Sequence, residues 1–441
     1  MAFLKKTIIW LLTLESRLII RKYKPFIIAV TGSVGKTATK DAIFTALSGN
    51  GHVRKSDKSL NSEIGLPLTI IGVPNAWKSM SGWIENLKTG AGLIFKRSKY
   101  PEVLVLEIGA DHPGDIKKVV KWLKPDISVI TKVGETPVHV EFFNSPAQVF
   151  EEKSALVRAL SPGGTAVLFA DEPKIVALGE EVAKGGVTLV TFGTDQSASV
   201  GGNEFSVAYE DVNGAKRIVG ISFSIIKKQV NDTDLAKHIE IKGVVGKTFM
   251  YPVLAAVAVA ISKGVPFDEA IKRVEKYHAP KGRMNIVQGK NGSTIIDDTY
   301  NSSPDAVAAA LEALKMIETS GKKIAVLGDM MELGLYSAEA HHGIAKQLIG
   351  VAHHLVTVGP RARVIAEDAR ELGMTESSVA SFSTAYEAAD ALQSIVGAGD
   401  VVLIKGSQSV RMERITKALM ADMSKAEQLL VRQEKEWLEK K

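Results

Sequence analysis

The chain has no cysteine among its 441 residues. Without a thiol it can form no disulfide bond, no thiolate zinc site and no cysteine nucleophile, so any metal must bind oxygen or imidazole ligands. A chain without disulfides suits a reducing compartment, and we therefore expect the protein to be cytoplasmic.

A strong charge imbalance and a long apolar run are also missing. The apolar stretch from Ile8 to Leu12 is far shorter than the ~20 residues of a membrane-spanning helix. The net charge of +6 is too dilute over 441 residues to predict nucleic-acid binding, but it suits an anionic ligand. With 45% hydrophobic and 24% charged residues the composition is that of a globular protein, and the length predicts roughly two to four domains.

Residues 1–25 are predicted to form an N-terminal amphipathic helix. Trp10, Leu14 and Leu18 recur at helical spacing, and we expect this face to pack on the body of the protein. The alternative is weak contact with a membrane surface, because the same helix carries basic side chains that suit anionic head groups: Arg17, Arg21, Lys22 and Lys24.

From Pro25 onward, short β-rich segments alternate with longer helical ones, which is typical of parallel sheets flanked by helices. We predict an α/β fold with a P-loop-type central ATPase domain over residues 26–280 and a C-terminal, Rossmann-like α/β domain over residues 281–425. The boundary lies at Ala279-Pro280-Lys281-Gly282-Arg283, where a stiff and a flexible residue interrupt the pattern. Residues 426–441 are predicted to be a charged helical tail on the surface, with four possible apolar anchors: Leu429, Leu430, Trp437 and Leu438.

The individual elements follow from the same pattern. In the central domain we predict strands at 26–30, 103–108, 127–131 and 165–169 and helices at 36–47 and 146–160. An irregular, β-rich flank is predicted over 187–241, in which 205–209 and 218–226 alternate like antiparallel strands. In the C-terminal domain we predict strands at 293–297, 323–327, 354–358 and 401–404. A helix is predicted at 303–317, because Ser303 can cap it and Pro304 suits its first turn.

The sharpest local motif is Thr31-Gly32-Ser33-Val34-Gly35-Lys36-Thr37, between a predicted strand and a predicted helix. In a phosphate loop the glycines let backbone amides face the phosphates, the lysine neutralises their oxygens, and the threonine hydroxyl can hold Mg²⁺. The strict pattern needs glycine at position 30, where Val30 stands, so the motif is the short form. The alternative is a glycine-rich turn with a surface lysine. We predict that the loop binds a nucleotide through five residues: Gly32, Ser33, Gly35, Lys36 and Thr37.

Further polar residues follow the predicted strands of the same sheet. Glu107 ends the strand at 103–108, so it is expected at the same sheet edge as the phosphate loop, where it could bind Mg²⁺. His139 follows the strand at 127–131, and Lys153 lies on the next helix. Taken singly, such a histidine or lysine is more often structural than functional.

Together these motifs resemble the Mur ligase family, the ATP-dependent amide-bond-forming enzymes of peptidoglycan synthesis. The resemblance covers about residues 26–425. Beyond the phosphate loop, its motifs are LNSEIGLPLT at 60–69, EIGADHPGDI at 107–116, HVEFF at 139–143, EKSAL at 152–156, GRM at 282–284, DDTYNSSPDA at 297–306, VLGDMMELG at 326–334 and KGSQSVRME at 405–413. The C-terminal motifs are most similar to the branch that joins D-alanyl-D-alanine to a muramoyl tripeptide.

The resemblance implies an acyl phosphate intermediate, with ATP and Mg²⁺ as cofactors and a muramoyl-peptide and D-Ala-D-Ala as substrates. It assigns catalysis to Lys36, Lys153, His139 and Arg283, and Mg²⁺ binding to Thr37, Glu107, His139 and Lys153, with Lys153 carbamylated. Arg283 is assigned to the ATP phosphates and Asp298 to the ribose, with Asp297 as the less favoured choice. Substrate binding is assigned to Asn61, Asn301, Lys405 and Ser407.

Only thirty residues precede Thr31, so we expect no separate N-terminal domain that binds a UDP-sugar. Two other functions compete with the D-alanyl-D-alanine ligase. One is a related ligase that extends another acidic peptide, as polyglutamate- or cyanophycin-forming enzymes do. The other is a non-catalytic, nucleotide-binding subunit. We expect a monomer that does not bind nucleic acid.

Overall fold

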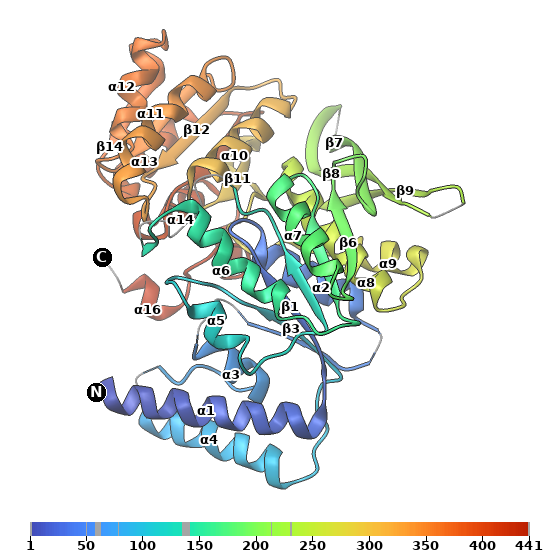
Figure 1. The fold of residues 1–441 in the computed structure, drawn as a ribbon. Coiled ribbons are helices and arrows are strands. Elements are labelled where there is room, and N and C mark those ends of the chain that lie inside the picture. The colour runs from blue at the N-terminus through green and yellow to red at the C-terminus, as the bar shows by residue number, and fades with distance from the viewer. Residues whose placement is uncertain are drawn as a thin grey trace.

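The computed structural model of the chain describes residues 2–49, 51–57, 63–77, 79–134, 142–212, 214–229 and 232–439. These residues form two α/β domains, each built around its own sheet (Figure 1). The predicted fold class is therefore confirmed: both sheets consist mainly of parallel strands flanked by helices.

The central sheet has nine strands in the order β2-β3-β1-β4-β5-β6-β7-β8-β9. Neighbours are parallel from β2 to β7, while the pairs β7–β8 and β8–β9 are antiparallel, so the predicted antiparallel flank extends the same sheet. The strands are β1 (Phe26–Thr31), β2 (Val53–Lys55), β3 (Val103–Glu107), β4 (Ile127–Ile130), β5 (Thr165–Phe169), β6 (Thr188–Gly193), β7 (Val200–Val212), β8 (Ala215–Lys227) and β9 (Leu235–Lys242).

Helices cover both faces of this sheet because its inner strands are apolar on both sides. Ile28 and Val30 of β1 belong to one buried cluster with α2, α8 and α9, whereas Ile27 and Ala29 belong to another with α1, α3, α5 and α6. The helices are α1 (Ala2–Tyr23), α2 (Lys36–Leu47), α3 (Gly65–Ile71), α4 (Met80–Phe95), α5 (Asp115–Val119), α6 (Pro146–Arg158), α7 (Pro173–Ala183), α8 (Met250–Ser262) and α9 (Phe267–Val274).

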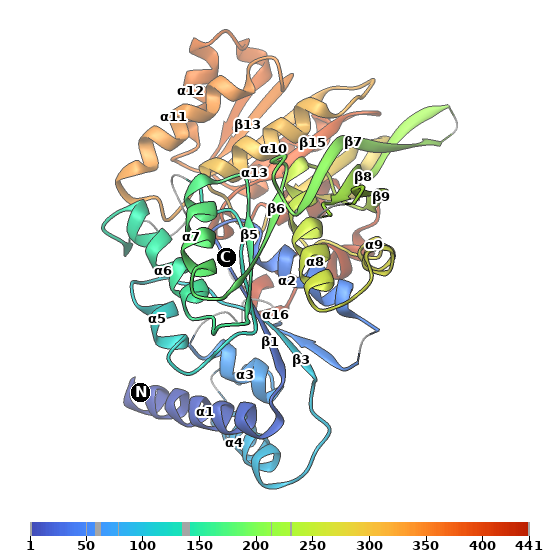
Figure 2. The same ribbon diagram turned by 45° about the vertical axis from the view of Figure 1, so that its right-hand side comes forward.

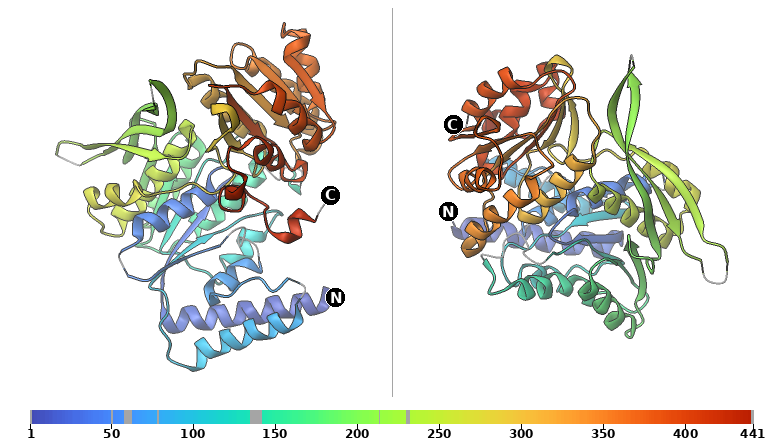
Figure 3. Two further views of the ribbon diagram at one scale, coloured as in Figure 1. Left: turned by 180° about the vertical axis from the view of Figure 1, so that it is seen from behind. Right: turned by 90° about the horizontal axis from the view of Figure 1, so that it is seen from above.

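The first helix packs with the opposite face to the one predicted. Ile8, Leu12 and Ile19 are buried against the sheet side of the domain. Trp10, Leu14 and Leu18 are instead exposed, by 63%, 39% and 38%. Both sets recur at helical spacing, so periodicity alone could not decide which one faces the core. Helices α1 and α4 lie side by side at the end of the molecule opposite the C-terminal domain (Figures 1 and 3).

The C-terminal sheet has the order β10-β11-β15-β12-β13-β14, and only the β10–β11 pair is antiparallel. Helices α10, α11 and α12 cover one face, and α13 and α14 cover the other, which makes the domain doubly wound as predicted. The elements are β10 (Asn285–Gln288), β11 (Thr294–Asp298), α10 (Pro304–Met316), β12 (Lys323–Gly328), α11 (Ser337–Leu348), β13 (His354–Val358), α12 (Arg363–Glu371), β14 (Val379–Phe382), α13 (Ala385–Ile395), β15 (Val401–Lys405) and α14 (Glu413–Leu419). The Ser303 hydroxyl caps α10 by accepting from the Ala306 amide.

The long β7–β8 hairpin reaches the C-terminal domain (Figure 2). The Tyr209 hydroxyl accepts a hydrogen bond from the Glu318 amide over 2.7 Å, and Lys216 forms an ion pair of 3.1 Å with the Glu318 carboxylate. Glu318 follows α10, so the antiparallel flank of the central sheet braces the second domain.

The prediction of one helical tail on the surface is wrong. After α14 the chain forms two short helices, α15 (Ala426–Leu429) and α16 (Lys435–Leu438), and it lies near the boundary between the domains (Figures 1 and 3). Leu430 is 1% exposed and Arg432 6% exposed, whereas Leu438 is 53% exposed. The buried side chains of Arg432 and Leu430 therefore hold the tail. Helical periodicity could not predict this, because it does not show which distant residue a buried arginine will pair with.

Across the parts of the chain that the structure describes, no helix is long and apolar enough to span a membrane.

Candidate active site

The phosphate loop connects β1 to α2 by a turn that only glycine permits. Gly32 has φ +145°, and a Cβ built on it would lie 1.9 Å from Thr131 Oγ1, at the end of β4. Gly35 has φ +85°, in the left-handed region, immediately before α2 begins at Lys36. The amides of Ser33 and Val34 both donate to the Lys132 carbonyl oxygen, at 2.9 and 3.0 Å.

Lys36 is the first residue of α2. The N-terminus of a helix binds anions, because its free backbone amides and the helix dipole favour negative charge there. Burial lowers the pKa of Lys36, Glu107 opposes that shift, and Arg283 of the other domain adds to it. Lys36 Nζ also lies 3.5 Å from the Ser33 carbonyl oxygen. Arg283 therefore lies close enough for its charge to act on Lys36, and two neighbouring cations suit a polyanion such as the phosphates of a nucleotide.

Thr37 and Glu107 come together beside this lysine. The Thr37 hydroxyl donates to Glu107 Oε1 over 3.1 Å, and Lys40 Nζ lies 3.9 Å from Glu107 Oε2. A hydroxyl and a carboxylate oxygen side by side fit Mg²⁺, which prefers oxygen ligands and keeps water and phosphate oxygens in its other positions. Within the described ranges no group of three or more His, Cys, Asp or Glu residues could hold a metal ion. Two protein ligands of this kind fit an ion held jointly with a nucleotide.

Lys153 reaches the phosphate loop from α6. Its side chain is buried, and its Nζ donates to the Gly32 carbonyl oxygen over 2.9 Å. Burial, followed by the charge of Lys36, lowers the pKa of Lys153 well below its ordinary value of 10.5, while Asp111 and Glu152 raise it. A lowered pKa favours the neutral amine, which is the nucleophilic form of a lysine.

Two acidic residues of this region were not assigned roles from the sequence. Glu152 accepts hydrogen bonds from the amides of Gly114, Ile116 and Lys117 at 2.7–3.1 Å, so it anchors the start of α5. The charge of Asp111 acts on both Lys36 and Lys153. The sequence feature that could have identified Asp111 is its position four residues after Glu107, at the same strand end.

Arg283 of the C-terminal domain is positioned by an aromatic ring. Its guanidinium carbon lies 4.2 Å from the centre of the Tyr300 ring, and its charge is felt at Lys36 and at Lys405. The structure therefore brings Lys36 and Arg283 to one site, although they are 247 residues apart in the chain.

Asp298 and Lys405 form a buried ion pair next to Arg283. Lys405 Nζ lies 2.7 Å from Asp298 Oδ2 and donates to the Asn301 carbonyl oxygen over 3.0 Å; Lys405 is 1% exposed. Burial lowers the pKa of Lys405 and the Asp298 carboxylate raises it. Asn301 Oδ1 accepts from the Ser302 amide at 2.9 Å. These residues share the carboxyl end of the C-terminal sheet, and their ligand roles stay predictions.

Ser407 follows Lys405 by two residues, and its side chain forms a hydrogen bond within the protein. It is 2% exposed, its hydroxyl accepts from the Met331 amide over 2.9 Å, and its own amide donates to the Asp329 carbonyl oxygen over 3.0 Å. The pair of hydrogen bonds ties the loop after β15 to the loop after β12. Asn61 and His139, which were also predicted as site residues, lie outside the described residues.

Asp297, the less favoured choice for the ribose, is fully buried, and its role toward a ligand stays a prediction. Its Oδ1 accepts from the hydroxyls of Thr299 and Thr416 at 2.8 and 2.9 Å, and its Oδ2 is buried without a hydrogen-bond partner. Burial raises the pKa of Asp297 from its ordinary 3.8 to about 7; Asp298 and Glu413 add to the rise.

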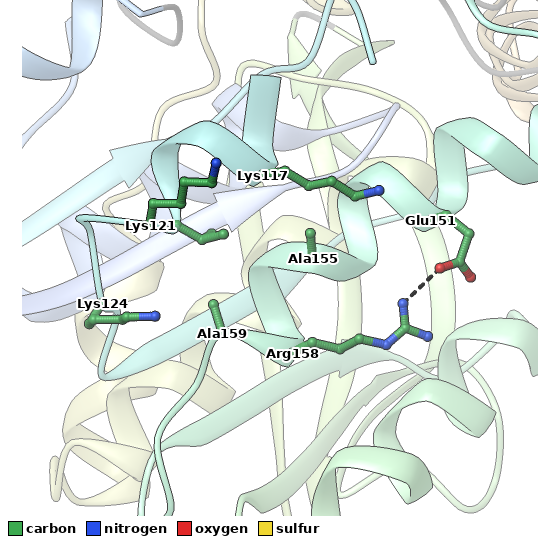
Figure 4. A pocket seen from close by; sticks show the side chains of 8 residues that line it. Lys117, Lys121, Lys124, Glu151, Ala155, Arg158 and Ala159 are labelled. Carbon is green, nitrogen blue, oxygen red and sulfur yellow. Dashed lines mark hydrogen bonds and ion pairs between the residues drawn. The ribbon is translucent and has the colours of Figure 1, made fainter. Parts of the chain in front are cut away.

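A separate basic depression lies on the outer side of α6 (Figure 4). Lys117, Lys121 and Lys124 line it together with Arg158, which is paired with Glu151 at 2.8 Å. At 100° per residue, Arg158 and Lys153 lie on opposite sides of α6. The depression is therefore not part of the site around the phosphate loop.

The fold and the phosphate loop define a two-domain α/β enzyme of the P-loop type. Residues 30–260 match the Mur ligase middle domain, and residues 282–408 match the Mur ligase glutamate ligase domain. The chain belongs to the Mur ligase family.

Named relatives are similar over most of the chain. The UDP-N-acetylmuramoyl-tripeptide--D-alanyl-D-alanine ligase of Bacillus subtilis is 28% identical over 396 residues, which is 89% of this chain and 76% of that protein. The structure of MurF ligase from Thermotoga maritima in complex with ADP is 27% identical, with a TM-score of 0.72 over 95% of this chain and 84% of that one. A MurF structure from Acinetobacter baumannii, 24% identical, has a TM-score of 0.74 over 93% of this chain and 80% of its own, which supports the fold.

The buried Asp297 carboxyl predicts a pH-dependent stability. Because its folded pKa of about 7 exceeds its unfolded value, Asp297 takes up a proton on folding. The contribution of this carboxyl to the free energy of unfolding is greatest below about pH 4 and is lost as the pH rises through about 7. We expect Asp297→Asn, which keeps an oxygen for Thr299 and Thr416 but cannot ionise, to be more stable than the parent at pH 8.5 by roughly 1–3 kcal/mol.

Urea unfolding at pH 5 and at pH 8.5 measures this difference. At pH 5 the advantage of Asp297→Asn should be smaller than at pH 8.5, since the carboxyl has by then lost only part of its contribution to stability. Asp329→Ala is a control at the end of a strand of the same sheet, because it removes the Oδ1 that accepts from the Arg361 and Ala362 amides and should therefore lose stability at both pH values. A parallel pH dependence in parent and Asp297→Asn would contradict the assignment.

Proposed function

We propose that this protein is an ATP-dependent ligase of peptidoglycan precursor synthesis that joins D-alanyl-D-alanine to a muramoyl tripeptide. The observation that carries the proposal is the convergence of Lys36, the Thr37–Glu107 pair and Arg283 on one site, from two domains of a Mur ligase fold. The name of the Bacillus subtilis relative supports this substrate pair.

In the proposed reaction, the terminal carboxylate of the tripeptide attacks the γ-phosphorus of ATP, and ADP leaves. The amine of D-alanyl-D-alanine then attacks the acyl phosphate carbon. A C–N bond forms, the C–O bond to phosphate breaks, and the amine loses a proton. Phosphoryl transfer depends mainly on positioning and charge neutralisation, so the roles of Lys36 and Arg283 are to hold the phosphates and offset their charge.

Mg²⁺ supplies further charge neutralisation at the phosphates when it is bound, and Thr37 and Glu107 would hold it. Carbamylation of Lys153 is the second part of the proposal. Its neutral amine would attack CO₂, forming an N–C bond and releasing a proton, and the resulting carbamate has anionic oxygens of the kind that Mg²⁺ binds. His139 is proposed to share that ion.

The alternatives differ in what the protein should do with ATP. A ligase for another acidic peptide would release phosphate with a different acceptor and amine. A non-catalytic subunit would bind nucleotide without turnover. The retention of two cations and a Thr–Glu oxygen pair around one site favours turnover, because a scaffold needs no matched set of charges at the γ-phosphate position.

The functional test is phosphate release with ATP, the muramoyl tripeptide and D-alanyl-D-alanine. We expect turnover that needs all three substrates. Turnover should fall at least about 100-fold in Lys36→Ala, because the variant lacks the positive charge that offsets the charge of the transferred phosphoryl group. Lys184→Ala removes an exposed lysine at the end of α7 and should keep full activity. If ATP turnover requires a different amine, the D-alanyl-D-alanine assignment is wrong; equal turnover in Lys36→Ala would reject the phosphate-loop role.

Carbamylation is tested without relying on activity alone. With ¹³CO₂, the parent should give a carbamate carbon signal by NMR, and Lys153→Ala should lose it. Lys153→Ala should also lose activity and recover part of it with short-chain carboxylates, which can replace the carbamate oxygens. Lys36→Ala is the control that carboxylates should not rescue. Absence of a Lys153-dependent signal in the active parent would refute the modification.

We also propose a weak contact between the outer side of α1 and an anionic membrane surface. Trp10, Leu14, Arg17 and Arg21 follow one another at intervals of four, three and four residues, so they share one helix face, and all four are exposed. Apolar and basic side chains on one exposed face suit the boundary between head groups and acyl chains. Lys22 does not belong to this surface, because its ammonium donates to the carbonyl oxygens at the end of α4: Leu93, Ile94 and Lys96.

Co-sedimentation with phosphatidylglycerol-containing vesicles tests this surface. We expect the parent to bind them more strongly than phosphatidylcholine vesicles, and the double variant Trp10→Ser, Leu14→Ser to bind at least about tenfold more weakly. Leu335→Ser changes a fully exposed apolar residue of the C-terminal domain and should bind like the parent. Equal pelleting of the parent with both vesicle types would contradict the contact.

The cellular setting completes the proposal. The cysteine-free composition supports action in the cytoplasm, and the dilute net charge supports peptide and small-molecule substrates in place of nucleic acid. We propose a monomer, which sedimentation equilibrium would test.

A further inference from the structure

The chain after α14 returns to the loop between β11 and α10 and holds it with one arginine. Arg432 Nη1 donates to the Thr299 carbonyl oxygen over 3.0 Å, and Arg432 Nη2 donates to the Tyr300 carbonyl oxygen. Arg432 is only 6% exposed. One planar guanidinium therefore fixes two successive carbonyl groups, which a lysine, with its single ammonium, cannot do in the same geometry.

Arg432 is itself held by a buried charged cluster. Its Nη1 also donates to Glu413 Oε2 over 2.9 Å, while Arg411 Nε donates to Glu413 Oε1 over 2.6 Å. Arg411 Nη1 donates to the Trp437 carbonyl oxygen over 2.9 Å, and the Trp437 ring lies 5.4 Å from Arg411 and 5.8 Å from Arg432. Glu413 is 1% exposed.

Such a cluster is a poor device for stability alone. The cost of removing three charges from water offsets much of their attraction, and apolar replacements of buried ion pairs are often neutral or stabilising. The cluster instead fixes a geometry, because it holds the Arg432 guanidinium so that its N–H groups donate to the carbonyl oxygens of Thr299 and Tyr300.

Tyr300 connects this cluster to Arg283. The Tyr300 ring lies under the Arg283 guanidinium at 4.2 Å, and the Tyr300 amide donates to the Gly282 carbonyl oxygen over 3.0 Å. Gly282 has φ +68°, and a Cβ on it would lie 3.0 Å from the Tyr300 nitrogen and 3.1 Å from Val431 Cγ1. The segments that carry Arg283, Tyr300 and Arg432 are therefore packed directly on one another.

We infer that Arg432 is a positioning residue for nucleotide binding: it fixes the Thr299–Tyr300 backbone, and through the Tyr300 ring it sets the direction of Arg283 toward the site of Lys36. This inference rests on the proposed role of Arg283 at the ATP phosphates. It assigns to the last fifteen or so residues a function in the active site that no surface tail would have.

The test compares Arg432→Lys with Arg414→Lys in the full-length protein. Arg414 is the control because it belongs to the same part of the chain and stacks on a tyrosine, Tyr386, at 4.4 Å, away from Tyr300. Calorimetry with a non-hydrolysable ATP analogue should give at least about fivefold weaker binding for Arg432→Lys and parent-like binding for Arg414→Lys. In turnover assays Arg432→Lys should raise KM for ATP while KM for D-alanyl-D-alanine stays within about twofold.

A double-mutant cycle separates positioning from a general structural effect. If Arg432 acts through Arg283, then Arg283→Lys combined with Arg432→Lys should bind the analogue as weakly as Arg283→Lys alone, within about twofold. Fully additive losses would overturn the inference, and so would unchanged binding in Arg432→Lys. An Arg432→Lys chain that fails to fold would show a role in the fold and would also overturn it.

Tyr300 provides a second, independent measurement. Tyr300→Phe keeps the ring and should bind the analogue like the parent, whereas Tyr300→Leu should match Arg432→Lys. Failure of the proposed function would look different. In that case the parent would lack turnover with D-alanyl-D-alanine, or Lys36→Ala would bind the analogue normally, whatever the Arg432 variants do.

Discussion

The contact between the phosphate loop and the end of β4 is the constraint on which the site depends. The Thr131 side chain occupies the space where a Cβ on Gly32 would lie, and its hydroxyl donates to the Val34 carbonyl oxygen over 2.7 Å. The Ser33 and Val34 amides are held by the Lys132 carbonyl oxygen. Because the loop is fixed from the neighbouring strand, α2 begins at one defined place, and Lys36 and Thr37 follow from it.

Burial then decides the chemistry of the side chains around this loop. Burial lowers the pKa of both lysines, but the shift is larger for Lys153, whose amine is hydrogen-bonded to the loop backbone. At Lys36 the carboxylate of Glu107 opposes the shift. Two lysines a short distance apart thus have different environments and are suited to different tasks. Glu152, the neighbour of Lys153, serves the backbone of α5 and so fixes the approach of the segment that contains Asp111.

The second domain contributes two cationic side chains to the candidate site, and contacts within that domain hold both of them in place. Arg283 is held by Tyr300, and Lys405 is tied to Asp298 and to the Asn301 carbonyl oxygen. The hairpin contacts between Tyr209 or Lys216 and Glu318 brace the two domains at a distance from this site. The candidate site therefore takes residues from both domains, and its geometry depends on how the two sheets are held together.

The amino-acid sequence by itself determined the alternation of strands and helices, the phosphate loop, the Ser303 cap and the order of the family motifs, because these depend on neighbouring residues and local backbone preferences. Helix α2 begins and ends where it was predicted, and most of the predicted strands differ from the observed ones by one residue at an end. Tertiary structure alone decided which face of α1 is buried, since Ile8, Leu12 and Ile19 repeat with the same period as the exposed Trp10, Leu14 and Leu18. It also decided that Asp297 is buried while Asp298 meets Lys405, and that Arg432 reaches Thr299 across 133 residues. Burial and charge pairing between distant segments are set by how the elements pack, and no local pattern records them.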